Sequence, residues 1–102
     1  MLRLAESLPE RPTARVIRNQ ILRCGSSVGA NYRAACRAKS KPDFVSKMST
    51  VEEEADETIY WMELLTDSGI VKLKRIADLM DEADQIVSIV VASIKTARSS
   101  KH

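Results

Sequence analysis

Histidine, cysteine, glycine, proline and aromatic residues are all scarce in this chain of 102 residues. It holds one histidine (His102), two cysteines, three glycines, three prolines and four aromatic residues. Nucleophilic catalysis by a serine or cysteine has no histidine partner, and carboxylate-rich metal centres of helical bundles need Glu-x-x-His motifs that are absent. We therefore expect no enzyme, no metal site and no cofactor.

Long hydrophobic runs are also missing. The longest apolar stretch, residues 86–94, has nine residues, against roughly 20 needed to cross a bilayer. The first twelve residues lack the apolar run of a signal peptide. Cys24 and Cys36 lie about 18 Å apart if they share one helix, which is too far for a disulfide bond. We expect reduced thiols in a cytoplasmic protein.

The net charge of +2 hides a strong segregation along the chain. Residues 1–50 hold ten Lys or Arg against three Asp or Glu (+7), and residues 51–71 hold seven acids and no base (−7). Residues 72–102 hold six bases and four acids (+2). Such blocks indicate helices of opposite charge packed side by side, or a basic face kept for a partner.

Apolar residues recur in alternating steps of three and four along three segments, a heptad pattern that we call the seam of each segment. In residues 12–39 the seam holds Ala14, Ile17, Ile21, Cys24, Val28, Asn31, Ala35 and Ala38. In residues 43–68 it holds Phe44, Met48, Val51, Ala55, Thr58, Met62 and Leu65. In residues 72–99 it holds Leu73, Ile76, Met80, Ala83, Val87, Val90, Ile94 and Ala97.

Pro12, Pro42 and Gly69 mark where these segments begin or end. Pro12 fits the first turn of a helix, Asp43 suits a cap or first turn, and Gly69 is a natural left-handed stop. A short helix over residues 2–8 precedes them. Because the connections are short, the sequence predicts a single all-α domain, an antiparallel up-and-down bundle with helices over 2–8, 12–39, 43–68 and 72–99.

The stretch GSSVGAN, residues 25–31, has the composition of a loop. A phosphate-binding loop would need a preceding strand, other spacing and a lysine, all of which are absent. A helix-turn-helix with its turn at residues 25–27, and with Arg33 and Arg37 facing DNA, stays open. The seam crosses the stretch in phase, however, which favours one continuous helix. Gly25 and Gly29 would then lie where another helix comes close.

Around this stretch the sequence resembles the four-helix-bundle family of proteins encoded in intervening sequences of large-subunit ribosomal RNA genes. That family is related to the accessory variability protein of diversity-generating retroelements. The residues that carry the resemblance are Arg23, Cys24, Ser27, Ala30, Asn31, Ala34, Ala35, Asp43, Phe44, Glu54, Glu57, Thr58, Trp61 and Met62.

The resemblance implies an antiparallel four-helix bundle that assembles into a homopentameric ring. It implies no reaction, since the family has no established catalytic activity. In the retroelement relatives the ring binds a reverse transcriptase and nucleic acid through basic surfaces. Family members usually carry a full-length first helix, whereas here only residues 1–8 precede Pro9.

Five arginines share the side of the second helix that faces away from its seam: Arg11, Arg15, Arg18, Arg33 and Arg37. A solvated surface is one interpretation of such a stripe. Sequence-independent binding of a nucleic-acid backbone is the other, because it needs only positive charge along one face.

Polar residues beside the seams are expected to fix the register of the bundle. We predict that Glu54 meets Arg23 or Asn31 across the helix pair, with Ser27 close by and Glu57 one turn further on. Trp61 is expected to fill the core or an interface.

Four apolar residues exceed what one small bundle can bury and indicate subunit contacts: Leu22, Ile86, Ile89 and Val90. The predicted function is a non-enzymatic oligomeric scaffold, expected as a pentamer, that binds RNA, DNA or a nucleic-acid-processing protein. The alternative is a purely structural or protein-interaction oligomer, with a helix-turn-helix DNA-binding protein a third candidate.

Overall fold

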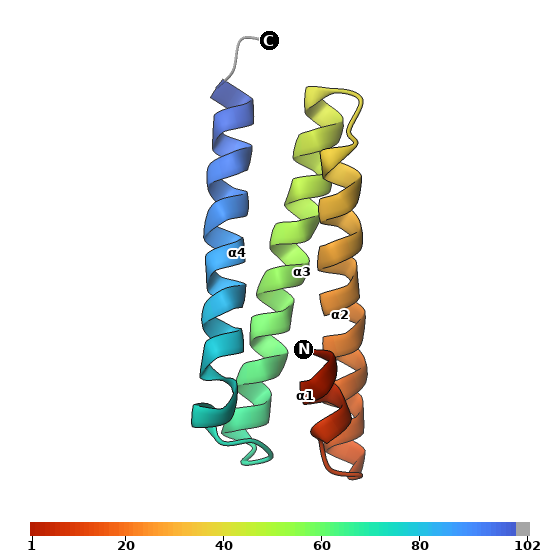
Figure 1. Cartoon of the computed structure of the whole chain (residues 1–102), viewed down its shortest axis with the longest axis vertical. Coiled ribbons are helices and arrows are strands. Elements are labelled where there is room, and N and C mark those ends of the chain that lie inside the picture. Colours follow the sequence, from red (N-terminus) through yellow and green to blue (C-terminus); the bar gives the residue numbers. More distant parts are fainter. Residues whose placement is uncertain (100–102) are drawn as a thin grey trace.

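The computed structural model describes residues 1–99, which form helices and no strand. The helices are α1 (Leu2–Ser7), α2 (Pro12–Cys36), α3 (Lys41–Asp67) and α4 (Leu73–Ser99). The three long helices lie side by side in a bundle of 50 × 20 × 16 Å, and α1 lies beside one half of it (Figure 1). None of the described helices is both long and apolar enough to cross a membrane.

The helices follow one another in alternating directions, so that α3 runs opposite to both α2 and α4 (Figure 1). The close helix pairs are α2 with α3, α3 with α4, and α1 with α2, so α3 is the central helix. The all-α bundle with a short first helix, predicted from the heptads and the short connections, is confirmed.

Local signals place the helix ends. Pro12 opens α2, where its missing N–H removes no helical hydrogen bond. Ser40 caps α3 by accepting a bond from the Asp43 N–H at 3.2 Å, and the Asp43 carboxylate accepts from the Lys39 N–H at 3.4 Å. This reciprocal capping starts α3 at Lys41, two residues earlier than expected. Gly69, two residues after the end of α3, adopts the left-handed conformation of a helix stop, with φ +75°.

The loop-like stretch of residues 25–31 lies inside α2, which continues unbroken from Pro12 to Cys36. The helix-turn-helix alternative is therefore wrong. Its turn would have changed the helix axis, whereas the seam keeps its phase through both glycines and so keeps facing α3.

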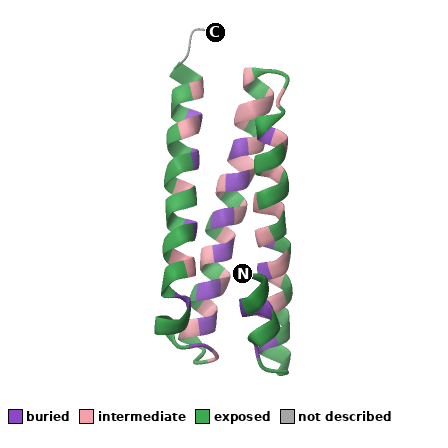
Figure 2. Cartoon of the chain, in the orientation of Figure 1, coloured by how far each residue is buried: buried purple, intermediate pink, exposed green. Residues whose placement is uncertain are grey.

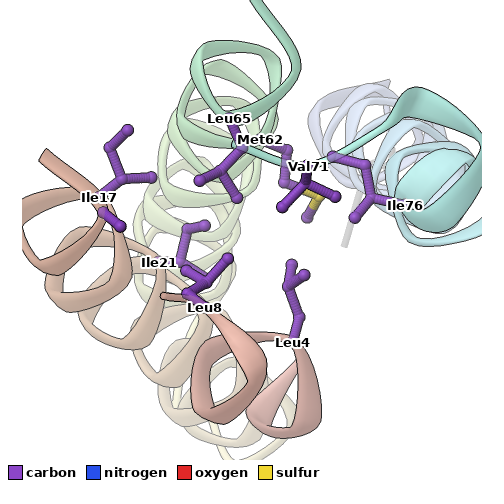
Figure 3. Close-up of a cluster of buried hydrophobic side chains, with 9 residues drawn as sticks. Leu4, Leu8, Ile17, Ile21, Met62, Leu65, Val71 and Ile76 are labelled. Carbon is purple, nitrogen blue, oxygen red and sulfur yellow. The ribbon is translucent and has the colours of Figure 1, made fainter. Parts of the chain in front are cut away.

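The seams form the core, in two clusters at opposite ends of the bundle (Figure 2). The first cluster is built by Leu4, Leu8, Ala14, Ile17, Ile21, Met62, Leu65, Val71 and Ile76, and Figure 3 shows the leucines of the α1 segment pointing into it. The second cluster consists of Ala35, Met48, Val51, Val90 and Ile94. Leu73 is 58% exposed, so its assignment to the seam is wrong, because it is the first residue of α4.

Because α1 is short, it covers only the half of the bundle that holds the first cluster. Beyond it lies a hollow of about 340 Å³, which we call the open groove. Its lining has no charged residue: Val28, Gly29, Tyr32, Val51, Ile86, Ile89 and Val90.

Candidate functional site

One polar network joins α2 to α3, and Arg23 is its centre. The guanidinium donates from Nη1 to Glu54 Oε2 at 3.2 Å and from Nη2 to Glu57 Oε1 at 2.7 Å. Its Nε donates to the Gln20 side chain at 3.0 Å. The predicted contact of Glu54 with Arg23 is present, and Glu57 adds a shorter one. The pattern works because Arg23 flanks the seam of α2 while both glutamates, three residues apart, flank the seam of α3.

Cys24 lies beneath this network and is fully buried. Its Sγ accepts a bond from Arg23 Nη2 at 3.0 Å. Burial, and after it the hydrogen bond to Glu57, together raise the pKa of the Cys24 thiol to about 12. The hydrogen bond from Arg23 lowers the pKa of Glu57 below its ordinary value. The thiol is therefore protonated and the carboxylate ionised at neutral pH.

The ligand atoms of Cys24, Glu54 and Glu57 lie within 4.8 Å of one another. A thiolate and two carboxylates could in principle hold a metal ion. Here, however, the Arg23 guanidinium already bonds both carboxylates, and a metal-binding thiol would have to lose a tightly held proton. The arrangement fits an ion-pair network that fixes two helices.

The other predicted polar residues bond mostly within their own helices. Asn31 Nδ2 donates to the carbonyl and the hydroxyl of Ser27 at 2.9 and 3.0 Å, so the contact with Glu54 is made by Arg23 alone. Trp61 Nε1 donates to Glu57 Oε1 at 3.4 Å, and its ring packs edge-on against Tyr60 at 5.0 Å between ring centres. Trp61 thus extends the Arg23 network along α3.

The two glycines of α2 differ in their surroundings. A Cβ on Gly25 would collide with the Met1 sulfur, so α1 comes close at this point. At Gly29 no described atom lies within 4 Å of where a Cβ would be. The close approach expected at Gly29 is absent among residues 1–99.

The five predicted arginines fall into two groups at opposite ends of α2. Arg15 and Arg18 lie 3.9 and 3.3 Å from the Glu10 carboxylate, and Arg11 is the residue before the helix. Arg33 and Arg37, about 22 Å further along the helix axis, make no ion pair within residues 1–99. The expected stripe is therefore interrupted: Arg15 and Arg18 are paired with Glu10, whereas Arg33 and Arg37 are unpaired among residues 1–99.

The structure adds bases to that second part, which sequence reasoning missed. The end of α2, the start of α3 and the end of α4 meet at one end of the bundle (Figure 1). Residues 33–49 and 92–99 there hold seven bases and one acid, Asp43. We call this surface the basic end, and its bases are Arg33, Arg37, Lys39, Lys41, Lys47, Lys95 and Arg98. The alternating helix directions, which the sequence did predict, were the available signal.

The predicted subunit-interface residues are also divided. Ile86 and Ile89 line the open groove, and Ile89 is 61% exposed. Leu22 is half-buried, whereas Val90 lies in the second core cluster and is covered by the chain itself.

The model of the 23S rRNA-intervening sequence protein family matches residues 1–92. A solved structure of a protein with unknown function from the S23 ribosomal protein family of Bacteroides thetaiotaomicron VPI-5482 is similar, with a TM-score of 0.85 and 33% sequence identity. The similarity covers 92% of this chain and 87% of the other. No curated protein matches the sequence.

Proposed function

Because this chain belongs to the 23S rRNA-intervening sequence protein family, we propose that it is a non-enzymatic, cytoplasmic, self-associating protein that binds nucleic acid. The observation that carries the proposal is the basic end, where residues 33–49 and 92–99 bring together seven bases and one acid, from three helices and the connection between α2 and α3. Phosphate backbones are attracted by such a concentration of positive charge without any base-specific contact.

Two arginines of the basic end are not paired with an acid among residues 1–99. Arg33 and Arg37 form no ion pair among the described residues, whereas Arg15 and Arg18 share Glu10. After Asp43, the next acid of α3 is Glu52, which lines one hollow with Lys95 and Arg98. A phosphate backbone can therefore approach Arg33 and Arg37 without displacing an ion-pair partner among residues 1–99.

A non-enzymatic role is consistent with the chemistry of the polar network. The buried thiol of Cys24 is held protonated, and a protonated thiol is a poor nucleophile. The Glu57 carboxylate is bonded to Arg23 and its pKa is lowered, which is the opposite of what a general base at neutral pH requires.

A protein-interaction oligomer is the second candidate, and the open groove favours it. Exposed apolar residues that line a neutral groove are typical of sites that another protein covers. Self-association is part of both candidates, and the family resemblance leads us to expect a ring of five chains. Light scattering coupled to chromatography measures this number directly.

The nucleic-acid proposal is tested with a labelled RNA duplex and a labelled DNA duplex, measured by fluorescence anisotropy at low and at physiological salt. The wild-type protein should bind both, more weakly as salt rises. In the variant Arg33→Glu/Arg37→Glu, affinity at low salt should fall at least tenfold. The slope of log K against log salt should fall by about 2, since two phosphate contacts are lost.

Arg11→Glu/Arg15→Glu is the matched control, because it makes the same charge change at the other end of α2. It should weaken binding much less. Equal losses in both variants would place the contact outside the basic end. No binding by the wild-type protein at low salt would reject nucleic-acid binding and leave the protein-interaction oligomer.

A further inference from the structure

An exposed flank of α4, beside α3, carries a second heptad pattern that the core does not use. Its positions advance by 3, 4, 3, 4 and 3 residues, which keeps them on one side of the helix. All six residues are exposed: Asp81, Asp84, Ser88, Val91, Lys95 and Arg98.

The order of charge along this face is two acids, two small or apolar residues, and two bases. The helix dipole explains part of it, since Arg98 lies in the last turn of α4, where a base is favourable. It does not explain the acids, because the first turn of α4 holds no acid. The four charged residues make no ion pair within residues 1–99, although Asp81 accepts a bond from the Gln85 side chain at 3.1 Å.

The face is complementary to itself when two copies are placed antiparallel. A two-fold axis that passes between residues 89 and 90 brings Asp81 opposite Arg98, Asp84 opposite Lys95, and Ser88 opposite Val91. Every contact then occurs twice, as a self-complementary interface requires. In an antiparallel pair of heptad helices, each a position of one helix faces a d position of the other, as in these three pairs.

We propose that a second copy of this chain docks on this exposed flank of α4, antiparallel, with Asp84 against Lys95 and Asp81 against Arg98 in both directions. Charge complementarity selects this occupant, since a parallel pair would place acids against acids and bases against bases. The inference rests on the self-association in the proposed function and not on nucleic-acid binding.

The centre of the face can exclude water. Val91 is 44% exposed, and Val87 beside it is half-buried. A hollow of about 490 Å³ adjoins it, lined by Val91, Ile94, Lys95, Arg98, Ser99 and Glu52 of α3. Glu52 lines the same hollow as Lys95 and Arg98 and can also attract them. Pairing therefore requires that Asp81 and Asp84 of the second copy attract these two bases more strongly than Glu52 does.

One face of a single helix is a small interface. The contact therefore belongs to the weak class, below the roughly 1,200 Å² of a stable complex, and should be sensitive to salt. A two-fold contact joins two chains if it acts alone, and two rings if each ring forms through other surfaces. Lys95 and Arg98 then face the partner, so phosphate binding falls to the other bases of the basic end.

Charge reversal tests the proposal, with mass measured by sedimentation at high protein concentration and low salt. Asp84→Lys and Lys95→Asp should each lower the pairing affinity at least tenfold, because each replaces two attractive contacts by repulsive ones. Mixing the two single variants should restore pairing, since one chain then supplies both lysines and the other both aspartates. The double variant Asp84→Lys/Lys95→Asp should pair with itself.

Asp78→Lys is the matched control, because it makes the same charge change on another side of α4 and should keep the wild-type mass. Circular dichroism of each variant checks that the helices are intact. Single reversals that keep the wild-type mass would overturn the proposal, as would a mixture that fails to pair. A wild-type protein that shows no two-fold association at low salt would overturn it too, and the duplex-binding assay with Arg33→Glu/Arg37→Glu would still decide nucleic-acid binding.

Discussion

At the residue scale, the two cysteines show how position alters one kind of side chain. Cys24 is buried beneath Arg23 and Glu57, and Cys36 is exposed at the end of α2. Burial and the carboxylate of Glu57 raise the pKa of Cys24 from the ordinary 9.0 to about 12. Only the thiolate is a strong nucleophile, so the two thiols should differ sharply in reactivity.

We predict that an alkylating reagent at mildly alkaline pH labels one thiol in the folded protein and two in denaturant. Cys36→Ser should remove the labelling of the folded state, and mass spectrometry counts the adducts.

The folded state holds the Cys24 proton more tightly than the unfolded state. The stability that depends on this proton is therefore complete below about pH 9 and is lost as pH rises towards 12. Labelling of Cys24 as fast as Cys36 in the native protein would contradict this account.

At the scale of the helices, two glycines have opposite effects on stability. Gly29 lies within α2 facing open space, where its missing side chain only weakens the helix. Gly69 follows α3 with φ +75°, a conformation that other residues adopt only with strain. The sequence pattern correctly predicted Gly69 as a helix stop. For Gly29 it predicted a close helix approach, which is not found among residues 1–99.

We predict that Gly29→Ala raises the free energy of unfolding by about 0.5–1 kcal/mol, through better helix propensity. Gly69→Ala should lower it by about 1–2 kcal/mol, because alanine is strained in the left-handed region. Urea denaturation followed by circular dichroism measures both changes. A loss of stability in Gly29→Ala would show that a neighbour covers this position in solution, as an oligomer formed through the open groove would do.

At the scale of the whole molecule, α1 divides the bundle into two halves. Beside α1 the first cluster is closed by Leu4 and Leu8. The N-terminal end of α1 lies near Gly25, where Met1 is found, and in the other half the second cluster is flanked by the open groove. The short first helix thus acts as part of the core and not as a loose end.

We predict that Leu4→Ala lowers the free energy of unfolding by about 2–5 kcal/mol, the range for a buried leucine. Leu2→Ala in the same helix should change it by less than about 0.5 kcal/mol, since Leu2 is 68% exposed. Chemical denaturation of both variants makes the comparison. Equal, small effects would mean that α1 is not docked in solution.

The sequence by itself determined the helices, their order and the residues that face α3. Heptad spacing depends only on the 3.6-residue helical repeat, so Ile21, Val51 and Met62 could be assigned to the core without coordinates. The contact of Arg23 with Glu54 could be predicted too, because these two residues of opposite charge flank the seams of neighbouring helices.

Only the tertiary structure decided which distant residues share a surface. The basic end gathers Arg33, Lys47 and Arg98 from three helices, and charge in separate segments adds up only once the ends meet. The open groove likewise combines residues of three helices, such as Val28 of α2, Val51 of α3 and Ile89 of α4. Heptad spacing shows which way a side chain points from its own helix, whereas its neighbours depend on how the helices are placed.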